Sequence, residues 1–244
     1  MPTVLVVEPD ASDPIGPLGD WLTAADLDLE VRRPYGGQSL PKDLSGYDAL
    51  VVLGGPQSAT DDATSAPAWM DDLRRLLGAA LARSVPVLAI CLGGQLLAQV
   101  AGGSVRVGSG GPEIGALLVG KRDAAFEDRI FAQLPITPMV IQWHHDEIDV
   151  LPPGAVLLAN SVTYPNQAFR VGACAWGLQF HIETTPAVIA AWAEQDHAGL
   201  AAAGLDKEQV VASAGESEHA EIAGVWGAFA TRFAAIVTQQ SAAA

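Results

Sequence analysis

The chain has 244 residues, of which 50% are hydrophobic and only 17% are Asp, Glu, Lys or Arg. This length fits one large domain or two small ones, and the composition excludes a largely disordered protein. The 28 acidic residues outnumber the 13 basic ones, so the formal net charge is −15. Such a surface repels nucleic-acid phosphates and anionic lipid headgroups. We therefore expect no nucleic-acid or membrane partner.

The cysteines and the N-terminus bear on the compartment. Cys91 and Cys174 are the two cysteines, and they form neither a disulfide framework nor a CxxC metal pattern. The first ten residues contain no basic segment followed by a cleavable apolar stretch, so we expect no signal peptide. These features predict a cytoplasmic protein with reduced thiols.

The first hundred residues alternate apolar runs with amphipathic stretches. Residues 3–7, 48–53 and 86–90 are short apolar runs that end at turn residues, as buried strands do. Residues 68–81 carry apolar side chains at helical spacing. This alternation predicts parallel strands with helices on both faces of the sheet.

The pattern changes after residue 104. Apolar runs at 114–119, 139–142, 155–159, 168–171 and 173–180 either extend the sheet or build an antiparallel flap on it. After His181 the chain is predicted to be helical, with Thr185 capping a helix that starts at Pro186. The last helix carries a core-facing apolar stripe that includes Trp226, Phe229 and Phe233. We predict a three-layer, doubly wound, mostly parallel α/β sheet over residues 1–195. A C-terminal helical extension over 196–244 is expected to pack on the same domain.

Cys91 occupies a distinctive position between a predicted strand and a predicted helix. A sharp strand-to-helix turn lifts its middle side chain to the edge of the sheet, and Gly93 and Gly94 make room for that path. The helix N-terminus stabilises negative charge on the sulfur. A lone cysteine in an apolar run is more often a buried structural residue. Position alone therefore leaves both interpretations open.

A histidine and a glutamate could activate this cysteine. His181 lies at the end of the predicted strand 173–180, and Glu183 follows two residues later. In extended backbone these side chains share a face, so Glu183 can orient the ring and stabilise its cationic form. Cys91, His181 and Glu183 then form an activated-nucleophile triad.

Two backbone N–H groups are candidates for an oxyanion hole. Gly54 and Gly55 end the strand 48–53, and a glycine without a side chain lets its N–H approach a reacting carbonyl. The N–H of Leu92, directly after the candidate nucleophile, is the second donor. We predict that Gly55 and Leu92 form this hole.

Residues 144–147 read His-His-Asp-Glu and resemble a metal cluster. Adjacent residues in extended chain point to opposite faces, and no third ligand stands at suitable spacing. We therefore expect no metal and no cofactor. Cys174, inside the predicted strand 173–180, is interpreted as a small core residue.

Three segments together resemble a known family. Val52-Leu53-Gly54-Gly55-Pro56-Gln57-Ser58, Cys91-Leu92-Gly93-Gly94-Gln95 and His181-Ile182-Glu183, in this order, resemble class I (triad-type) glutamine amidotransferases. The resemblance runs from about residue 4 to about residue 194. It implies a flavodoxin-like fold, a γ-glutamyl thioester on Cys91, His181 as base and Glu183 as its orienter.

The resemblance also implies a glutamine pocket. Gly54 and Gln95 would help to hold the glutamine moiety, and a segment that begins with Trp143 and His144 would line the pocket through its backbone. Two positions depart from the family pattern. Ile182 stands where the family has proline, and His145 stands where it has glycine, which puts the shape of the pocket in question.

Two further motifs, Glu113-Ile114-Gly115 and Asn166-Gln167-Ala168-Phe169-Arg170, resemble stand-alone members that are similar to GMP synthase glutaminases or γ-glutamyl peptidases. The resemblance implies hydrolysis of the γ-glutamyl amide of glutamine or a γ-glutamyl compound, which releases glutamate and ammonia or an amine. Two alternatives stay open: a glutaminase subunit that delivers ammonia to a separately encoded synthetase, and a catalytically silent binding subunit. Whether the chain forms a homo-oligomer also stays open.

Overall fold

The computed structural model describes residues 1–61 and 64–243. Its centre is an eight-stranded sheet with the order β2-β1-β3-β4-β12-β11-β10-β7. The strands in that order are β2 (Asp28–Arg32), β1 (Thr3–Val7), β3 (Ala49–Val52), β4 (Val87–Ile90), β12 (Ala175–Leu178), β11 (Ala168–Val171), β10 (Val156–Asn160) and β7 (Gly120–Lys121). Neighbours from β2 to β12 are parallel, and those from β12 to β7 are antiparallel.

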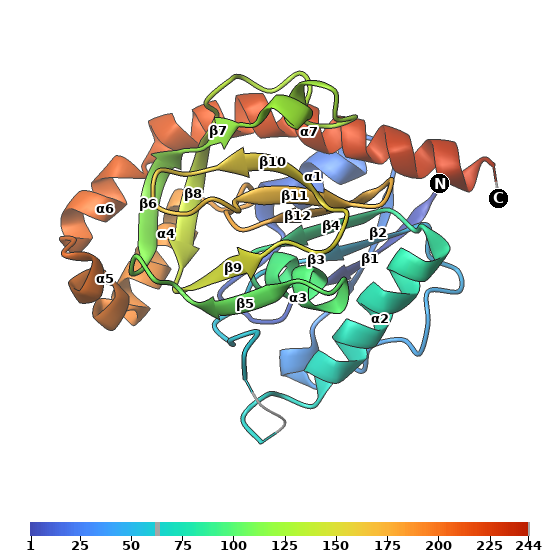
Figure 1. Cartoon of the computed structure of the whole chain (residues 1–244), viewed down its shortest axis with the longest axis horizontal. Helices are drawn as coiled ribbons and strands as arrows, with labels where there is room; N and C mark the ends of the chain where they lie inside the picture. The colour runs from blue at the N-terminus through green and yellow to red at the C-terminus, as the bar shows by residue number, and fades with distance from the viewer. Residues whose placement is uncertain (62–63, 244) are drawn as a thin grey trace.

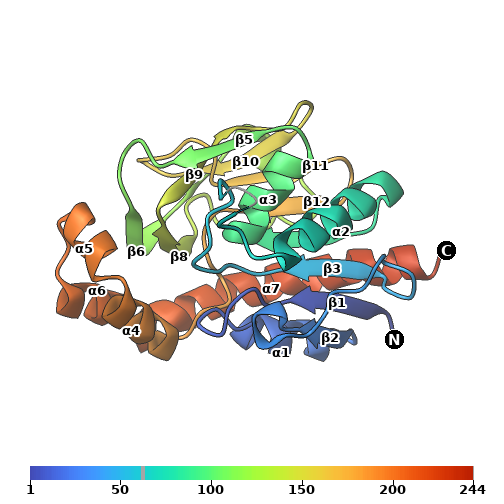
Figure 2. The ribbon, with the colours of Figure 1, turned by 90° about the horizontal axis from the view of Figure 1, so that it is seen from below.

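Helices cover both faces of this sheet (Figures 1 and 2). In β1, Val4 and Val6 pack in the same apolar cluster as α1 (Gly16–Ala24) and α7 (Glu216–Ser241). Leu5 and Val7 pack in a second cluster with α2 (Trp69–Arg83) and α3 (Leu92–Val100). Successive strand residues point to opposite faces, so a continuous apolar run fills two cores at once. The predicted three-layer, mostly parallel fold is confirmed.

The apolar runs after residue 104 belong to different sheets. Those at 155–159 and 168–171 extend the main sheet as β10 and β11. The runs at 114–119 and 139–142 instead form a separate antiparallel pair, β6 (Glu113–Leu118) with β8 (Met139–His144). A second antiparallel pair joins β5 (Ser104–Val107) to β9 (Asp146–Val150). A short 3₁₀ helix, η2 (Asp123–Phe126), also lies in this half, and another, η1 (Pro34–Gly36), follows β2.

The strand predicted at 173–180 is shorter in the structure. β12 covers only Ala175–Leu178, so Cys174 lies in the turn before it and not in a strand interior. Its thiol donates to the carbonyl oxygen of Ser84 over 3.1 Å, and the side chain is buried. The prediction of a small core residue is confirmed, and its placement inside a strand is wrong.

The C-terminal region is helical, as predicted, with α4 (Pro186–Gln195), α5 (His197–Ala203), α6 (Lys207–Ser213) and α7. The hydroxyl of Thr185 accepts the N–H of Val188, which confirms the predicted N-cap. A break at Asp196 separates α4 from α5, because its carboxylate caps the second helix through the N–H of Gly199. The division of the chain at residue 195 remains a prediction.

Among the described residues, α7 is the helix that by length and composition could cross a membrane. In the structure its large apolar side chains Trp226, Phe229 and Phe233 are fully buried in the sheet-facing core. A long helix packed in a protein core has the same apolar character, and this packing accounts for it.

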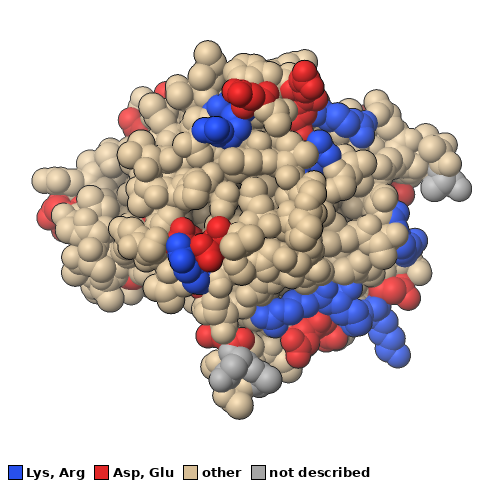
Figure 3. Space-filling view, viewed as in Figure 1, with Lys and Arg blue, Asp and Glu red and all other residues tan. Residues whose placement is uncertain are grey.

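Charged side chains are sparse over much of the face seen in Figure 3. Where basic side chains gather there, acidic ones lie beside them, most visibly along α2. On that helix Arg74 pairs with Asp71 and Arg75 pairs with Asp72.

Candidate active site

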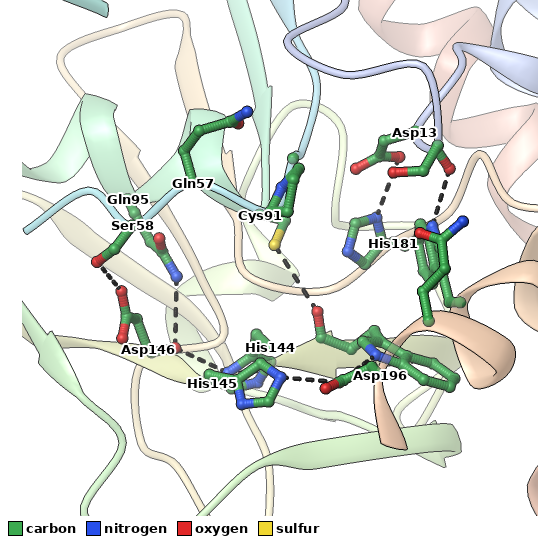
Figure 4. Close-up of a pocket in the computed structure, with 16 residues that line it drawn as sticks. Asp13, Gln57, Ser58, Cys91, Gln95, His144, His145, Asp146, His181 and Asp196 are labelled. Carbon is green, nitrogen blue, oxygen red and sulfur yellow. Dashed lines mark hydrogen bonds and ion pairs between the residues drawn. The ribbon is translucent and has the colours of Figure 1, made fainter. Parts of the chain in front are cut away.

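The site lies at the edge of the sheet where the parallel strands β1, β3, β4 and β12 end. The strand order changes direction between β1 and β3. In open α/β sheets, ligands bind outside the carboxyl ends of the strands at such a switch point. The loops after these four strands bring Asp13, Gly55, Cys91 and His181 to one cavity of about 370 Å³ (Figure 4).

Cys91 forms the turn between β4 and α3, as predicted. Its backbone has φ +50° and ψ −110°, which is a strained conformation for a residue with a side chain. A Cβ on Gly93 would lie 2.5 Å from the carbonyl oxygen of Val52, and one on Gly94 would lie 2.5 Å from that of Leu178. Only glycine therefore lets α3 start this close to β3 and β12.

The sulfur of Cys91 lines the cavity, and the side chain is 7% exposed. Sγ lies 4.0 Å from the carbonyl oxygen of Trp143 and 4.0 Å from Nε2 of Gln179. The thiol thus faces the cavity, while most of the Cys91 side chain is buried.

His181 and Glu183 are paired through a short hydrogen bond. His181 Nδ1 lies 2.7 Å from Glu183 Oε1, and both residues are 1% exposed. His181 is not at a strand end, because β12 stops at Leu178, but its backbone bonds Ile141 of β8 in both directions. The N–H of Ile182 donates to Glu183 Oε2 over 2.7 Å. A proline at 182 would lack this donor, so the departure from the family pattern adds a hydrogen bond to the carboxylate.

The charges around His181 favour its cationic form. Burial lowers the pKa of the ring, but the negative charges of Glu183, Cys91 and Asp13 outweigh it and hold the pKa well above the ordinary 6.5. Hydrogen bonding with Cys91 acts in the same direction. The ring of Trp192 packs against the imidazole at 4.8 Å between centroids. The histidine is therefore fixed in position and equipped to carry a proton.

Asp13 is a site residue that the sequence analysis missed. It lies in the loop between β1 and α1, is 2% exposed and lines the cavity. Oδ1 lies 3.9 Å from His181 Nδ1. The signal that could have found it is its position after the first parallel strand, because the loops after such strands meet at one sheet edge.

The other predicted residues divide between the cavity wall and the layer behind it. Gly55, Gln95, Trp143 and His144 line the cavity together with Cys91 and His181. Gly54 is packed behind them, where an added Cβ would lie 2.1 Å from Asp13 Oδ2 and 3.0 Å from His181 Cε1. Leu92 starts α3 with its side chain buried.

Gln95 and Gln57 form a polar side of the cavity. Gln95 Nε2 donates to the carbonyl oxygen of Asp146 and to Gln179 Oε1, each over 3.3 Å. Ser58 donates to the Asp146 carboxylate. Oε1 of Gln57, another residue that the sequence analysis missed, is buried and without a hydrogen-bond partner among the described residues. Within the described part of the chain it is a buried acceptor without a partner, in a residue that lines the cavity.

His145 stands at the rim, where its side chain is half exposed. Its Nε2 lies 2.8 Å from Asp196 Oδ2, the oxygen that also accepts the indole N–H of Trp143 over 3.0 Å (Figure 4). Asp196 thus ties the junction of α4 and α5 to the cavity wall, and His145 is directed at that junction.

One residue from each of the two additional sequence motifs, Glu113 and Gln167, belongs to a buried hydrogen-bond network with His144. His144 Nε2 lies 3.2 Å from Glu113 Oε2, and Gln167 Nε2 donates to the same oxygen over 2.7 Å. The other ring nitrogen of His144 lies 2.8 Å from the carbonyl oxygen of Asp146. This buried network fixes the backbone of the segment that lines the cavity.

A cluster with metal-binding potential among the described residues is formed by Asp13, His181 and Glu183, whose ligand atoms lie within 4.8 Å of one another. His181 and Glu183 are only 2.7 Å apart. Two ligands about 2.1 Å from a tetrahedral zinc ion are separated by roughly 3.4 Å. The spacing is that of a hydrogen-bonded pair and does not fit an ion between them.

The fold and this geometry agree with comparisons to known proteins. Residues 22–191 match the family model "Glutamine amidotransferase class-I". The chain belongs to this family. The glutamine amidotransferase-like protein YfeJ of Salmonella typhimurium is 30% identical over 167 residues, which are 68% of this chain and 69% of that protein. Membership supports an enzymatic role for the chain.

GMP synthase of Thermotoga maritima is 38% identical to this family member over 142 residues. The match covers 58% of this chain but only 25% of the synthase, so this chain corresponds to about a quarter of that enzyme. A crystal structure of a glutamine amidotransferase from Thermotoga maritima superposes with a TM-score of 0.83 at 30% identity and covers 96% of this chain and 98% of that one. A glutamine amidotransferase from Methylobacillus flagellatus gives 0.79 at 28% identity and covers 98% and 94%.

Proposed function

We propose that this protein hydrolyses the γ-glutamyl amide bond of glutamine or a γ-glutamyl compound through a thioester on Cys91. The observation that carries the proposal is the strained turn that presents Cys91 to a cavity shared with a buried His181–Glu183 pair. A nucleophile, a base and a group that orients the base are the parts that covalent acyl transfer needs.

The proposed reaction has two halves. The Cys91 sulfur attacks the amide carbonyl, and the backbone N–H groups of Gly55 and Leu92 hold the oxyanion. His181 gives its proton to the departing nitrogen as the C–N bond breaks, which leaves an acyl thioester and ammonia or an amine. The neutral ring then takes a proton from water, whose oxygen attacks the thioester. Glutamate leaves, and Cys91 and the protonated ring are restored.

The polar side of the cavity is suited to the amino-acid end of the substrate. Gln57 lines the cavity, and a rotation of its amide would let Oε1, which is buried without a partner in the described structure, accept a hydrogen bond from an α-ammonium group. Gln95 holds the carbonyl of Asp146 in the same wall, and Trp143 and His144 extend it. We assign the substrate's glutamyl moiety to this side.

The cavity has room for glutamine and for a modestly larger γ-glutamyl compound. Pockets of roughly 300–1,000 Å³ hold drug-sized ligands, and this one is about 370 Å³. Trp192, Gln195 and Asp196 close it on the side of His181, where the departing amine would lie. The second candidate function is delivery of ammonia to a separately encoded synthetase, which the similarity to a quarter of GMP synthase favours.

Measurement of glutamate release tests the proposal. The purified protein is incubated with glutamine and with a panel of γ-glutamyl amides, and rapid quenching with mass spectrometry looks for a γ-glutamyl adduct on Cys91. We expect turnover of at least one compound, an adduct on Cys91, and no turnover by a folded Cys91→Ser variant. Near-wild-type release by that variant would exclude the nucleophile assignment. A protein that is inert alone but active with an added synthetase would favour the second candidate.

A further inference from the structure

A second carboxyl group stands beside the same ring nitrogen that Glu183 binds. Asp13 Oδ1 lies 3.9 Å from His181 Nδ1, and Glu183 Oε1 lies 2.7 Å from it. Asp13 is 2% exposed, and its Oδ1 has no hydrogen-bond partner among the described residues. Figure 4 shows the Asp13 carboxyl directed at the imidazole.

The chain is built to bring Asp13 there. A Cβ on residue 54 would lie 2.1 Å from Asp13 Oδ2, so the carboxyl of Asp13 fits here only because residue 54 is glycine. Gly16, at φ +46°, similarly lets the start of α1 approach the backbone oxygen of Glu183, which a Cβ would meet at 2.3 Å. The indole N–H of Trp192 donates to the carbonyl of Ser12 over 2.8 Å. The two glycines therefore leave room for the loop that carries Asp13 beside the His181–Glu183 segment, and the bond from Trp192 holds the loop there.

Carboxylate oxygens of Asp13 and Glu183 lie within 4.8 Å of each other. Two carboxylates this close in a buried site cannot both ionise at low cost, so one of them keeps a proton. Glu183 receives the N–H of Ile182 and is bonded to the imidazole, both of which stabilise its negative charge. Asp13 Oδ1 receives no such donor. The proton therefore belongs on Asp13 at neutral pH.

The electrostatics agree with this assignment. Burial raises the pKa of Asp13 to about 8, against a lowering by His181, and the charge and hydrogen bond of Glu183 raise it further. Asp10, in the same loop, adds the smallest contribution. Cys91 and Glu183 are the other charged groups that act on His181.

We propose that Asp13 is a positioning residue for His181. It is a second acid beside Nδ1 that is neutral at neutral pH and, once ionised, keeps the ring protonated in alkaline solution. The inference rests on the proposed role of His181 as proton donor to the departing nitrogen. That donor must be cationic, and a negative charge within about 4–6 Å favours the cationic form of an imidazole. When Asp13 ionises, the protein thus extends the pH range over which His181 holds its proton.

Asp13→Asn tests whether ionised Asp13 keeps His181 protonated, because asparagine resembles the neutral acid in shape and stays uncharged at every pH. The variant cannot supply the second negative charge, so His181 loses its proton at lower pH than in the wild type. Because the chain has 5 histidines, ¹⁵N-histidine labelling and a His181→Gln variant for assignment allow the ring to be titrated by NMR. Asp20→Asn, which removes an exposed acid of α1 that acts on neither Asp13 nor His181, is the control, and its His181 titration should follow the wild type.

The expected result is a lower titration midpoint of His181 in Asp13→Asn than in the wild type and the control. Equal midpoints in all three proteins would overturn the proposal. This measurement needs no substrate, so a shifted midpoint in a protein without hydrolytic activity would support the role of Asp13 and refute the proposed function. If Asp13→Asn does not fold, Asp13→Ser serves as a smaller neutral variant.

Kinetics give a second readout. We expect the ratio of Asp13→Asn to wild-type kcat to fall roughly tenfold between pH 6.5 and pH 9, with little change in KM. A purely structural role would lower the rate equally at every pH, and that result would overturn the proposal.

Discussion

At the scale of single residues, the strain at Cys91 is balanced by its neighbours. A φ of +50° on a residue with a side chain costs on the order of 1–3 kcal/mol and persists only when the surroundings determine it. Here the N–H of Cys91 donates to Leu178 of β12, and its carbonyl accepts the N–H of Gln95 in α3. A strand and a helix therefore fix the direction of the sulfur.

The Glu183 carboxylate acts on His181 in two ways: it accepts a hydrogen bond that orients the ring, and its negative charge stabilises the imidazolium. Glu183→Gln keeps a hydrogen-bond acceptor but removes the charge. The amide can still accept the N–H of Ile182, but it carries no charge to stabilise the imidazolium. We expect kcat to fall by roughly two to four orders of magnitude, less than in His181→Ala. Stopped assays of glutamate release on all three proteins, with thermal unfolding as the folding control, provide the comparison. Negligible effects of both substitutions would mean that the base lies elsewhere, and His144 and His145, which line the same cavity, would be the next candidates.

At the scale of elements, the sequence predicted best where the local pattern and the tertiary structure agree. The strands β1, β3 and β4 and the helix α2 are continuous apolar runs or a clear amphipathic repeat, and each is within a few residues of its predicted range. The elements β2, β5, β7 and β9 are half-exposed or very short, so their residues carry no comparable signal. The break at Asp196 depends on a capping bond that competes with an otherwise helical pattern.

The residues of the candidate site likewise include some that the sequence predicted and some that it did not. Cys91, His181 and Glu183 were predictable because they stand in short motifs with a defined spacing. Asp13 lies outside the sequence motifs, and Gln57 lies in one of them but received no role. The importance of both comes from burial without a partner, which only the packing of loops distant in sequence creates.

The short helices α5 and α6 allow a matched test of how the C-terminal region supports the cavity. Each begins with an aspartate N-cap, Asp196 and Asp206, but only Asp196 also binds Trp143 and His145. We expect each change to alanine to lower the free energy of unfolding by about 1 kcal/mol for the lost cap. Asp196→Ala should in addition raise KM several-fold, and Asp206→Ala should leave it unchanged. Denaturant titrations and steady-state kinetics on both variants measure this, and an equal KM in the two would show that the link to the cavity has no functional consequence.

At the scale of the whole molecule, the C-terminal helices contribute to both the core and the cavity. Trp192 of α4 packs on His181, and α7 crosses the face of the sheet that also carries α1 (Figure 2). The indole N–H of Trp226 donates to the carbonyl of Met139 at the start of β8. The region after residue 195 therefore shares one apolar core with the strands that position the site.

Truncation after residue 195 tests whether the region 196–244 can be separated. It removes Trp226, Phe229 and Phe233, which are fully buried, and each such side chain contributes roughly 1.5–3 kcal/mol on burial. Their sum is comparable to the whole stability of an ordinary domain, about 5–15 kcal/mol. We expect the truncated chain to lose its near-UV circular dichroism and its cooperative unfolding transition, whereas deletion of residues 242–244 alone should preserve both. A cooperative transition in the truncated protein would show that the N-terminal 195 residues fold by themselves, and that the helices are an addition to a core already complete without them.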